Sequence, residues 1–261
     1  MDPQPLIVPL VMANFDKLAS EDTFKCEIKP PFRMSDLGIT DKKDPSLQGV
    51  VAKINQQYKE WVSDLLEEEQ GFESEILALE ERTKNKETLD DMVVFYGSST
   101  IRLWNSLEED FPHINSLNLG FGGAFISSLS QHFERLFTFK APKVIVLYLG
   151  GNDLTLGWTA AKIVENINSL IEKIHHKYPT TTLLNLSIKP SLERAMQMEK
   201  IIQINTAMDA LSKNSTFLKQ VDFFDALMDG EAVKQQFLLQ DGLHLNTDGY
   251  EILKNHLKPY L

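Results

Sequence analysis

The sequence predicts an α/β fold, a three-layer α/β/α sandwich around a five-stranded, mainly parallel sheet, with an N-terminal helical extension. From residue 90 onward, short continuous apolar runs alternate with longer amphipathic segments, a pattern typical of parallel strands that helices cover on both faces. Before residue 90, the chain is first irregular, with its sharpest break at Pro30-Pro31, and then polar with a helical repeat. We therefore expect an extension over residues 1–89 and an α/β domain over residues 90–261.

The extension contains one predicted helical region, over residues 46–84. Apolar residues such as Ile54, Trp61 and Leu65 recur there at helical spacing, and Gly71 interrupts the repeat. This pattern is that of a polar helix with a single apolar stripe. We expect the stripe to pack on the α/β domain.

Five strands and five helices are predicted in the α/β domain. The apolar runs that indicate strands lie at residues 92–96, 117–119, 144–149, 182–188 and 221–224. The segments with a helical repeat lie at about residues 101–109, 126–137, 159–178, 192–212 and 247–257. Right-handed crossovers place such helices on both faces of the sheet, and ligands of such sheets bind at the carboxyl ends of the strands.

Charge and cysteine content exclude some classes of partner. The chain has 37 acidic and 26 basic residues and a net charge of −11, and it has no local cluster of Lys and Arg. It is therefore not expected to bind nucleic acid or an anionic membrane. The single cysteine, Cys26, cannot form an internal disulfide. No apolar run reaches the roughly 20 residues of a membrane span, and the N-terminus lacks the basic start of a signal peptide. We expect a cytoplasmic protein.

Four short segments carry groups that a serine hydrolase needs. They are Gly97-Ser98-Ser99, the NLGFGG stretch at 118–123, Gly151-Asn152-Asp153, and the DGLH stretch at 241–244. The serines lie between a strand and a helix, where one of them could be a nucleophile or only a helix cap. Asp241 and His244 are three residues apart, so that the carboxylate can hold one imidazole nitrogen while the other faces a serine.

The remaining two segments offer donors for a developing negative charge. The glycines of 118–123 provide exposed backbone N–H groups, and the Asn152 side chain provides an amide. A dinucleotide-binding loop is excluded because Phe125 stands where the last glycine of G-x-G-x-x-G, counted from Gly120, is required. The G-x-S-x-G elbow of α/β-hydrolases is also absent, because Ile101 follows Thr100.

The order and content of these segments resemble the SGNH, or GDSL-like, hydrolase family over roughly residues 90–261. The resemblance implies the flavodoxin-like SGNH hydrolase fold and no metal or other cofactor. It also implies that Ser99 rather than Ser98 is the nucleophile, with His244 as general base and Asp241 as its orienting acid. The Ser99 and Gly123 N–H groups and the Asn152 side chain would form the oxyanion hole. Ser98 stands where the family name has Asp, and Leu119 and Ala124 are apolar where relatives often carry polar residues, which leaves the substrate contacts open.

The expected function is therefore hydrolysis of a small-molecule carboxylic ester, with a short acyl group, through an acyl-enzyme on Ser99. Four apolar residues near the segments, Phe121, Phe125, Leu154 and Trp158, are candidates for an acyl pocket or for core packing. The alternatives are a carbohydrate O-acetylesterase, a thioesterase, a lysophospholipase and a non-catalytic binding module. The sequence does not indicate an oligomeric state.

Overall fold

The computed structural model of the chain describes residues 6–13, 25–39, 41, 43–69, 72–85 and 91–261. The chain divides into two compact units, Met1–Gly71 and Phe72–Leu261. Each unit has a hydrophobic cluster of its own. The expected site residues all belong to the second unit.

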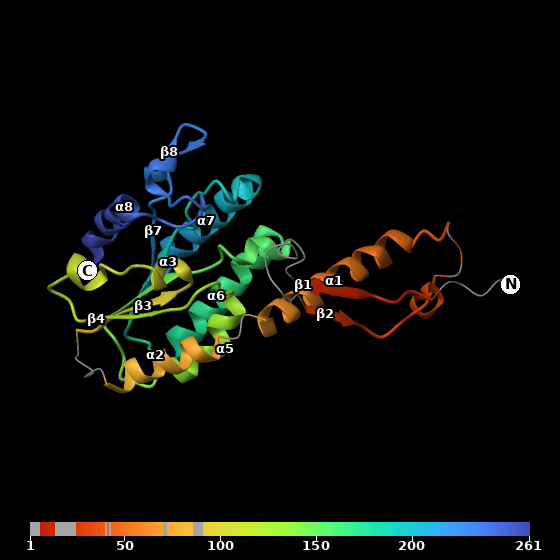
Figure 1. Cartoon of the computed structure of the whole chain (residues 1–261), viewed down its shortest axis with the longest axis horizontal. Helices are drawn as coiled ribbons and strands as arrows, with labels where there is room; N and C mark the ends of the chain where they lie inside the picture. The colour runs from red at the N-terminus through yellow and green to blue at the C-terminus, as the bar shows by residue number, and fades with distance from the viewer. Residues whose placement is uncertain (1–5, 14–24, 40, 42, 70–71, 86–90) are drawn as a thin grey trace. The chain divides into compact units, whose positions relative to one another are not determined.

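The first unit is a strand pair packed on one long helix (Figure 1). Strands β1 (Leu10–Ala13) and β2 (Lys25–Ile28) pair in antiparallel orientation, and helix α1 spans Leu47–Glu69. Val11 is fully buried against Trp61 and Val62 of α1, and the Tyr58 hydroxyl donates to the Leu10 carbonyl at 3.0 Å. The region that we expected to be irregular thus contains two strands, which are too short to produce a readable repeat. The side chain of Cys26 lies outside the described residues.

The second unit is built on a five-stranded sheet in which every neighbouring pair is parallel. The spatial order is β4-β3-β5-β6-β7. The strands are β3 (Val93–Gly97), β4 (Ser116–Gly120), β5 (Val144–Tyr148), β6 (Thr182–Leu186) and β7 (Leu218–Val221). A short antiparallel pair, β8 (Met228–Asp229) and β9 (Ala232–Val233), lies outside the sheet.

Strand β7 lies earlier in the chain than the apolar run at 221–224 indicates. It is the edge strand, so one side of it faces solvent, and its two middle residues, Lys219 and Gln220, are polar. An edge strand needs no continuous apolar run, because only part of it is buried. The run that we interpreted as a strand begins at the last residue of β7, Val221, and continues beyond it, where Phe223 and Phe224 are buried in the two hydrophobic clusters of the unit.

Helices cover both faces of the sheet and make the three-layer sandwich (Figure 1). One face packs against α2, α5, α6 and α7, through residues such as Tyr96, Leu119 and Leu147. The opposite face packs against α3, α4 and α8, through residues such as Phe95 and Val146. The bounds are α2 Glu73–Asn85, α3 Ser99–Arg102, α4 Leu107–Asp110, α5 Ile126–Leu136, α6 Ala160–Lys177, α7 Met198–Lys213 and α8 Thr247–Leu257.

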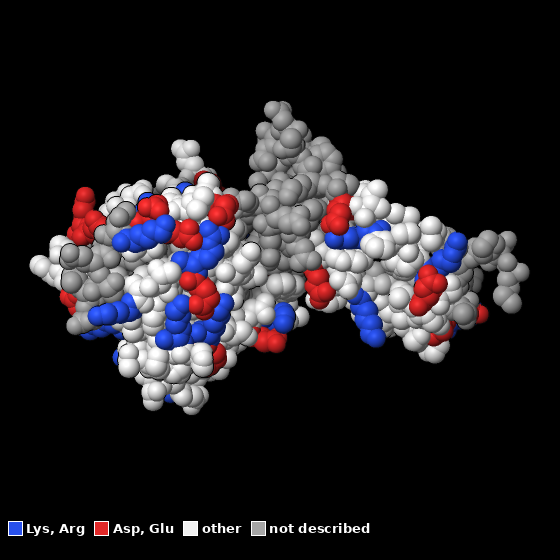
Figure 2. Space-filling view, turned by 90° about the horizontal axis from the view of Figure 1, so that it is seen from below, with Lys and Arg blue, Asp and Glu red and all other residues white. Residues whose placement is uncertain are grey.

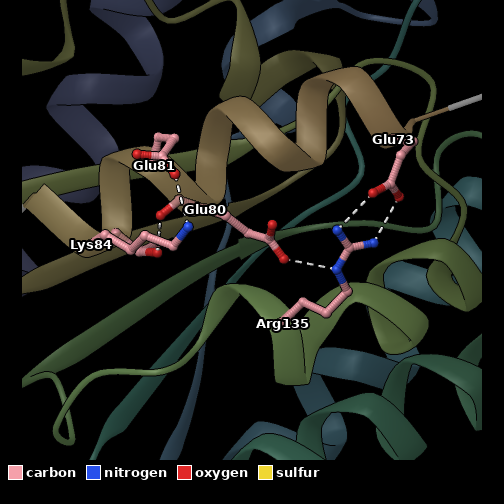
Figure 3. Close-up of polar contacts among 6 residues, drawn as sticks. Glu73, Glu80, Glu81, Lys84 and Arg135 are labelled. Carbon is pink, nitrogen blue, oxygen red and sulfur yellow. Dashed lines mark hydrogen bonds and ion pairs between the residues drawn. The ribbon is translucent and has the colours of Figure 1, made fainter.

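Helix α2 belongs to the sheet unit, which begins at Phe72 rather than at residue 90. Its residues Ile76 and Leu79 are buried in the cluster that contains α5 and α6. Figure 3 shows Arg135 of α5 between two carboxylates of α2. Its guanidinium donates to both oxygens of Glu73, at 2.7 and 2.9 Å, and to Glu80 at 2.8 Å. A single apolar stripe interrupted at Gly71 therefore spans two helices that pack in different units.

One face of the described surface carries mixed charge. On the face shown in Figure 2, Lys and Arg side chains are interspersed with Asp and Glu, and no patch of one sign is visible among the described residues. Of the helices that the structure describes, none is both long enough and apolar enough to cross a membrane.

Candidate active site

Ser99 lies where strand β3, which pairs with β4 on one side and β5 on the other, passes into helix α3. The strand ends at Gly97 and the helix begins at Ser99, so the serine sits at the carboxyl edge of the sheet. Gly97 is required there because a Cβ atom would lie 2.2 Å from the Tyr148 carbonyl oxygen of neighbouring strand β5. Ser98 is buried, and its N–H donates to that same carbonyl at 3.1 Å. Of the two serines, only Ser99 has its hydroxyl within hydrogen-bonding distance of an imidazole, that of His244.

Asp241, His244 and Ser99 form a continuous hydrogen-bonded chain. The Nε2 atom of His244 lies 2.9 Å from the Ser99 Oγ atom, and its Nδ1 atom lies 2.6 Å from Oδ2 of Asp241. A tight turn through Gly242, whose φ is +65°, brings the acid and the imidazole together. Residues 145 positions apart in the chain thus meet in the arrangement in which a base can take a serine proton.

The Asp241 carboxylate is held in its ionised form. Partial burial alone would raise its pKa, but the hydrogen bonds from His244 and from the backbone N–H groups of Leu243 and His244 outweigh it and lower the pKa to about 2. Those N–H groups donate to Oδ1 at 2.8 and 3.0 Å. Oδ1 therefore accepts the N–H groups of the turn, and Oδ2 accepts the imidazole N–H.

Asparagine and glycine residues of strand β4 attach it to helix α3, which carries Ser99. The Asn118 amide donates to the Ile101 carbonyl at 2.8 Å, and its oxygen accepts from the Gly120 N–H at 2.9 Å. A Cβ atom on Gly120 would lie 2.4 Å from the Arg102 backbone nitrogen. Helix α3 consequently packs directly on the end of β4.

Gly123 and Asn152 are the two further candidate oxyanion donors. Gly123 has a φ of +72°, a left-handed conformation that favours glycine. Asn152 follows β5, and its Nδ2 atom donates one hydrogen to the Ala124 carbonyl at 3.0 Å. Because an amide nitrogen has two hydrogens, the second is available to a substrate oxygen. Asn152 lines the same pocket as Ser99 and His244.

Two acidic residues support these donors without contacting the triad, and the motifs did not identify their roles. Glu75 of α2 accepts the Gly122 N–H at 3.0 Å. Asp153 is fully buried and accepts the Ile126 N–H at the start of α5, at 3.2 and 3.3 Å. The contact from Glu75 could not be found in the sequence, because α2 was expected to lie in the extension.

The pocket over Ser99 is narrow. It leaves about 20 Å³ for the centre of a water-sized sphere, close to the space that one buried water needs. Of the four apolar candidates, Leu154 lines it. Phe121 and Phe125 are buried in the core, and Trp158 packs against the core cluster. The lining residues are Ser98, Ser99, Thr100, Tyr148, Gly151, Asn152, Leu154, Ile188, Lys189, Ser191, Arg194, Leu243 and His244.

Three polar residues of that lining come from the segment after β6 and were not candidates from the sequence. They are Lys189, Ser191 and Arg194. The sequence feature that could have identified them is their position directly after an apolar run, because ligands bind at the carboxyl ends of the strands in such a sheet. Within the described residues, no group of three His, Cys, Asp or Glu side chains could hold a metal ion.

Comparisons with known proteins identify the family. The model of the GDSL-like lipase/acylhydrolase family matches residues 94–252. Among curated proteins, an N-acylneuraminate cytidylyltransferase of Escherichia coli is 22% identical over 181 residues, which are 69% of this chain and 42% of that protein. The chain thus spans about two fifths of the length of the curated relative that it matches.

Solved structures share the fold. A Streptococcus pneumonia protein described as a candidate platelet activating factor is 24% identical, with a TM-score of 0.63 over 80% of this chain and 98% of that one. A GDSL-like lipase from Bacteroides thetaiotaomicron is 19% identical, with a TM-score of 0.58 over 72% of this chain and 94% of that one. At these identities, the similarity shows the fold alone.

Proposed function

The chain belongs to the GDSL-like lipase/acylhydrolase family, and we propose that it hydrolyses short-acyl carboxylic esters through an acyl-enzyme formed on Ser99. Ester hydrolysis in general follows from the family. The observation that carries the serine mechanism is the hydrogen-bonded chain from the Ser99 Oγ atom through His244 to Asp241. We assign the activity to the sheet unit, residues 72–261.

The reaction starts with transfer of the Ser99 proton to Nε2 of His244 as Oγ attacks the ester carbonyl carbon. The carbonyl oxygen becomes an oxyanion. The N–H groups of Ser99 and Gly123 and the free Nδ2 hydrogen of Asn152 are our candidates for its donors. His244 then returns its proton to the departing alcohol, and Asp241 stabilises the imidazolium in the interval.

Water completes the cycle. His244 takes a proton from a water molecule, whose oxygen attacks the acyl-serine carbonyl. The carboxylic acid leaves, and Ser99 recovers its proton. No metal or cofactor takes part in any of these steps.

A short acyl group is favoured by the size of the pocket. The space beside Ser99, about 20 Å³ for the centre of a water-sized sphere, is close to that of a single water molecule, which favours a small acyl group there.

The test compares Ser99→Ala with Ser98→Ala, using 4-nitrophenyl acetate and a fluorophosphonate probe. We expect Ser99→Ala to lose turnover and labelling, whereas Ser98→Ala keeps both because its hydroxyl does not contact His244. Turnover by Ser99→Ala and none by Ser98→Ala would reverse the assignment. No labelling of the wild-type protein at any serine would favour a non-catalytic binding module.

Acyl preference is tested with a panel of esters. Initial rates on acetyl, butyryl and decanoyl esters of 4-nitrophenol are expected to fall with chain length. Acetylated sugars, an acyl-thioester and a lysophospholipid in the same panel separate the carbohydrate esterase, thioesterase and lysophospholipase alternatives.

A further inference from the structure

The segment that follows β6, residues 188–194, is held at both ends beside the triad. At its start, the Asn205 side chain of α7 accepts the Ile188 N–H at 2.8 Å and donates to the Ile188 carbonyl at 2.9 Å. Near its end, the Leu192 N–H donates to the Gly242 carbonyl, in the turn between Asp241 and His244, at 2.9 Å. Side chains of this segment therefore have defined positions relative to His244.

Lys189 places a cation in the wall of the pocket. Its side chain is 96% buried, since the residue is 4% exposed, and its Nζ atom donates to the Leu243 carbonyl, adjacent to His244. Burial lowers the pKa of this ammonium to about 8, with Asp241 acting against the shift and Arg194 adding to it. The group is thus protonated at neutral pH, and among the described residues only the Leu243 carbonyl accepts one of its three N–H donors.

Two more donors in the same wall have no partner among the described residues. The Ser191 hydroxyl belongs to a fully buried residue, and neither its Oγ atom nor the buried Nε atom of Arg194 makes a hydrogen bond. Buried polar groups are almost always paired, because leaving them unpaired is unfavourable. Both line the pocket that contains Ser99.

The charge of the lining is opposite to that of the chain. The whole chain has a net charge of −11, but the pocket lining contains Lys189 and Arg194 and no Asp or Glu. The carboxylate of Asp241, which acts on the Lys189 ammonium, is already engaged, since Oδ2 binds His244 and Oδ1 accepts two backbone N–H groups. None of the described ion pairs neutralises either cation.

From this arrangement, we propose that Lys189, Ser191 and Arg194 form an anion subsite next to Ser99, and that the substrate is an ester carrying a carboxylate or a similar anionic group. The inference rests on the proposed function, because it names the substrate class of that same site. An anion bound there would accept hydrogen bonds from the donors of Lys189, Ser191 and Arg194 that have no partner among the described residues. A guanidinium and an ammonium together suit a planar carboxylate.

The kinetic test uses matched esters that differ only in charge. We compare kcat/KM for 4-acetoxybenzoate and its neutral isostere 4-acetoxybenzamide, and for 4-nitrophenyl hemisuccinate and its neutral isostere 4-nitrophenyl succinamate. The first pair places the anion on the alcohol, and the second places it on the acyl group. The wild-type protein is expected to prefer the anionic member of at least one pair by about 10- to 100-fold, the range for hydrogen bonds to a charged group.

The variants separate charge recognition from support of the fold. Lys189→Met and Arg194→Gln are each expected to reduce that preference at least about tenfold. Lys200→Met, which removes a charge from α7 outside the pocket lining, is expected to leave it unchanged. If Lys189→Met lowers kcat/KM equally for both members of a pair, Lys189 only positions the loop of His244, and the subsite is refuted for this residue.

Binding gives a readout that does not depend on turnover. Calorimetric titration of the Ser99→Ala protein with 4-acetoxybenzoate and 4-acetoxybenzamide is expected to give tighter binding of the acid, and Lys189→Met in that background is expected to abolish the difference. Equal binding of acid and amide, together with equal hydrolysis of both, overturns the anion subsite while the esterase stands. Preferential binding of the acid in a protein that hydrolyses no ester supports the subsite and overturns the proposed function.

Discussion

Replacing Asp241 with asparagine tests the triad through the tautomer of His244. Oδ1 of Asp241 accepts the N–H groups of Leu243 and His244 at 2.8 and 3.0 Å. An asparagine must keep its carbonyl oxygen at that position, because its NH₂ group would face two donors there. The NH₂ group then lies opposite Nδ1 of His244, where Oδ2 stood at 2.6 Å.

The imidazole responds by changing which nitrogen carries the proton. Facing a donor, Nδ1 becomes an acceptor, and the proton moves to Nε2, which then points an N–H at the Ser99 hydroxyl. His244 can no longer take the serine proton. By analogy with the same exchange in serine proteases, kcat is expected to fall about 10⁴-fold.

The assay is the hydrolysis of 4-nitrophenyl acetate at neutral pH, with fluorophosphonate labelling as a second measure of Ser99 reactivity. Asp248→Asn is the matched control, since it removes the same charge from an exposed position in the first turn of α8, and it should retain full activity. Loss of less than tenfold in Asp241→Asn, with normal labelling, would refute the tautomer argument and the role of Asp241 with it.

Three other predictions follow from the same site. Asn152→Ala should lower kcat by about 10²–10³ with little change in KM, because one oxyanion donor is lost; an unchanged kcat excludes that donor. Gly120→Ala should shift α3 and lower kcat/KM about 10²-fold, because the new Cβ atom would lie 2.4 Å from the Arg102 backbone nitrogen. The control is Gly49→Ala, whose new Cβ atom would have no atom within 4 Å. Equal activity of the two variants would contradict the packing argument. Because the Asp241 pKa of about 2 lies below its ordinary 3.8, its carboxylate stabilises the fold above about pH 4 and loses this effect as the pH falls towards 2. The urea midpoints of wild type and Asp241→Asn should therefore converge over that range, and a gap that does not change with pH speaks against the shift.

Most of the sheet could be predicted from the sequence because its strands are buried on both faces. Strands β3 and β5 are continuously apolar and fully buried, so that local composition alone indicates them. Strand β7 was placed too late, because an edge strand with Lys219 in its middle lacks that signal. The pair β1 and β2 was missed because four-residue strands contain too few positions for a repeat.

The order of the four segments was readable, and the contacts between them were not. Strand ends and turns place Ser99, Asn152 and His244 at one edge of a parallel sheet, since that edge follows from connectivity alone. Phe121 lies within the 118–123 segment and Phe125 two residues after it, but both rings are buried in the core. Distance along the chain does not reveal which way a side chain points.

What the sequence by itself determined is the α/β/α sandwich and the set of candidate catalytic residues, because periodicity, strand ends and short turns are local properties of the chain. Only the tertiary structure could show that Glu75 accepts a hydrogen bond from the loop after β4 and that α2 belongs to the sheet unit. It alone also shows that Lys189 and Arg194 line the pocket. These features depend on segments that are distant in sequence and become neighbours through burial of apolar surface, which is non-directional and leaves no local signature.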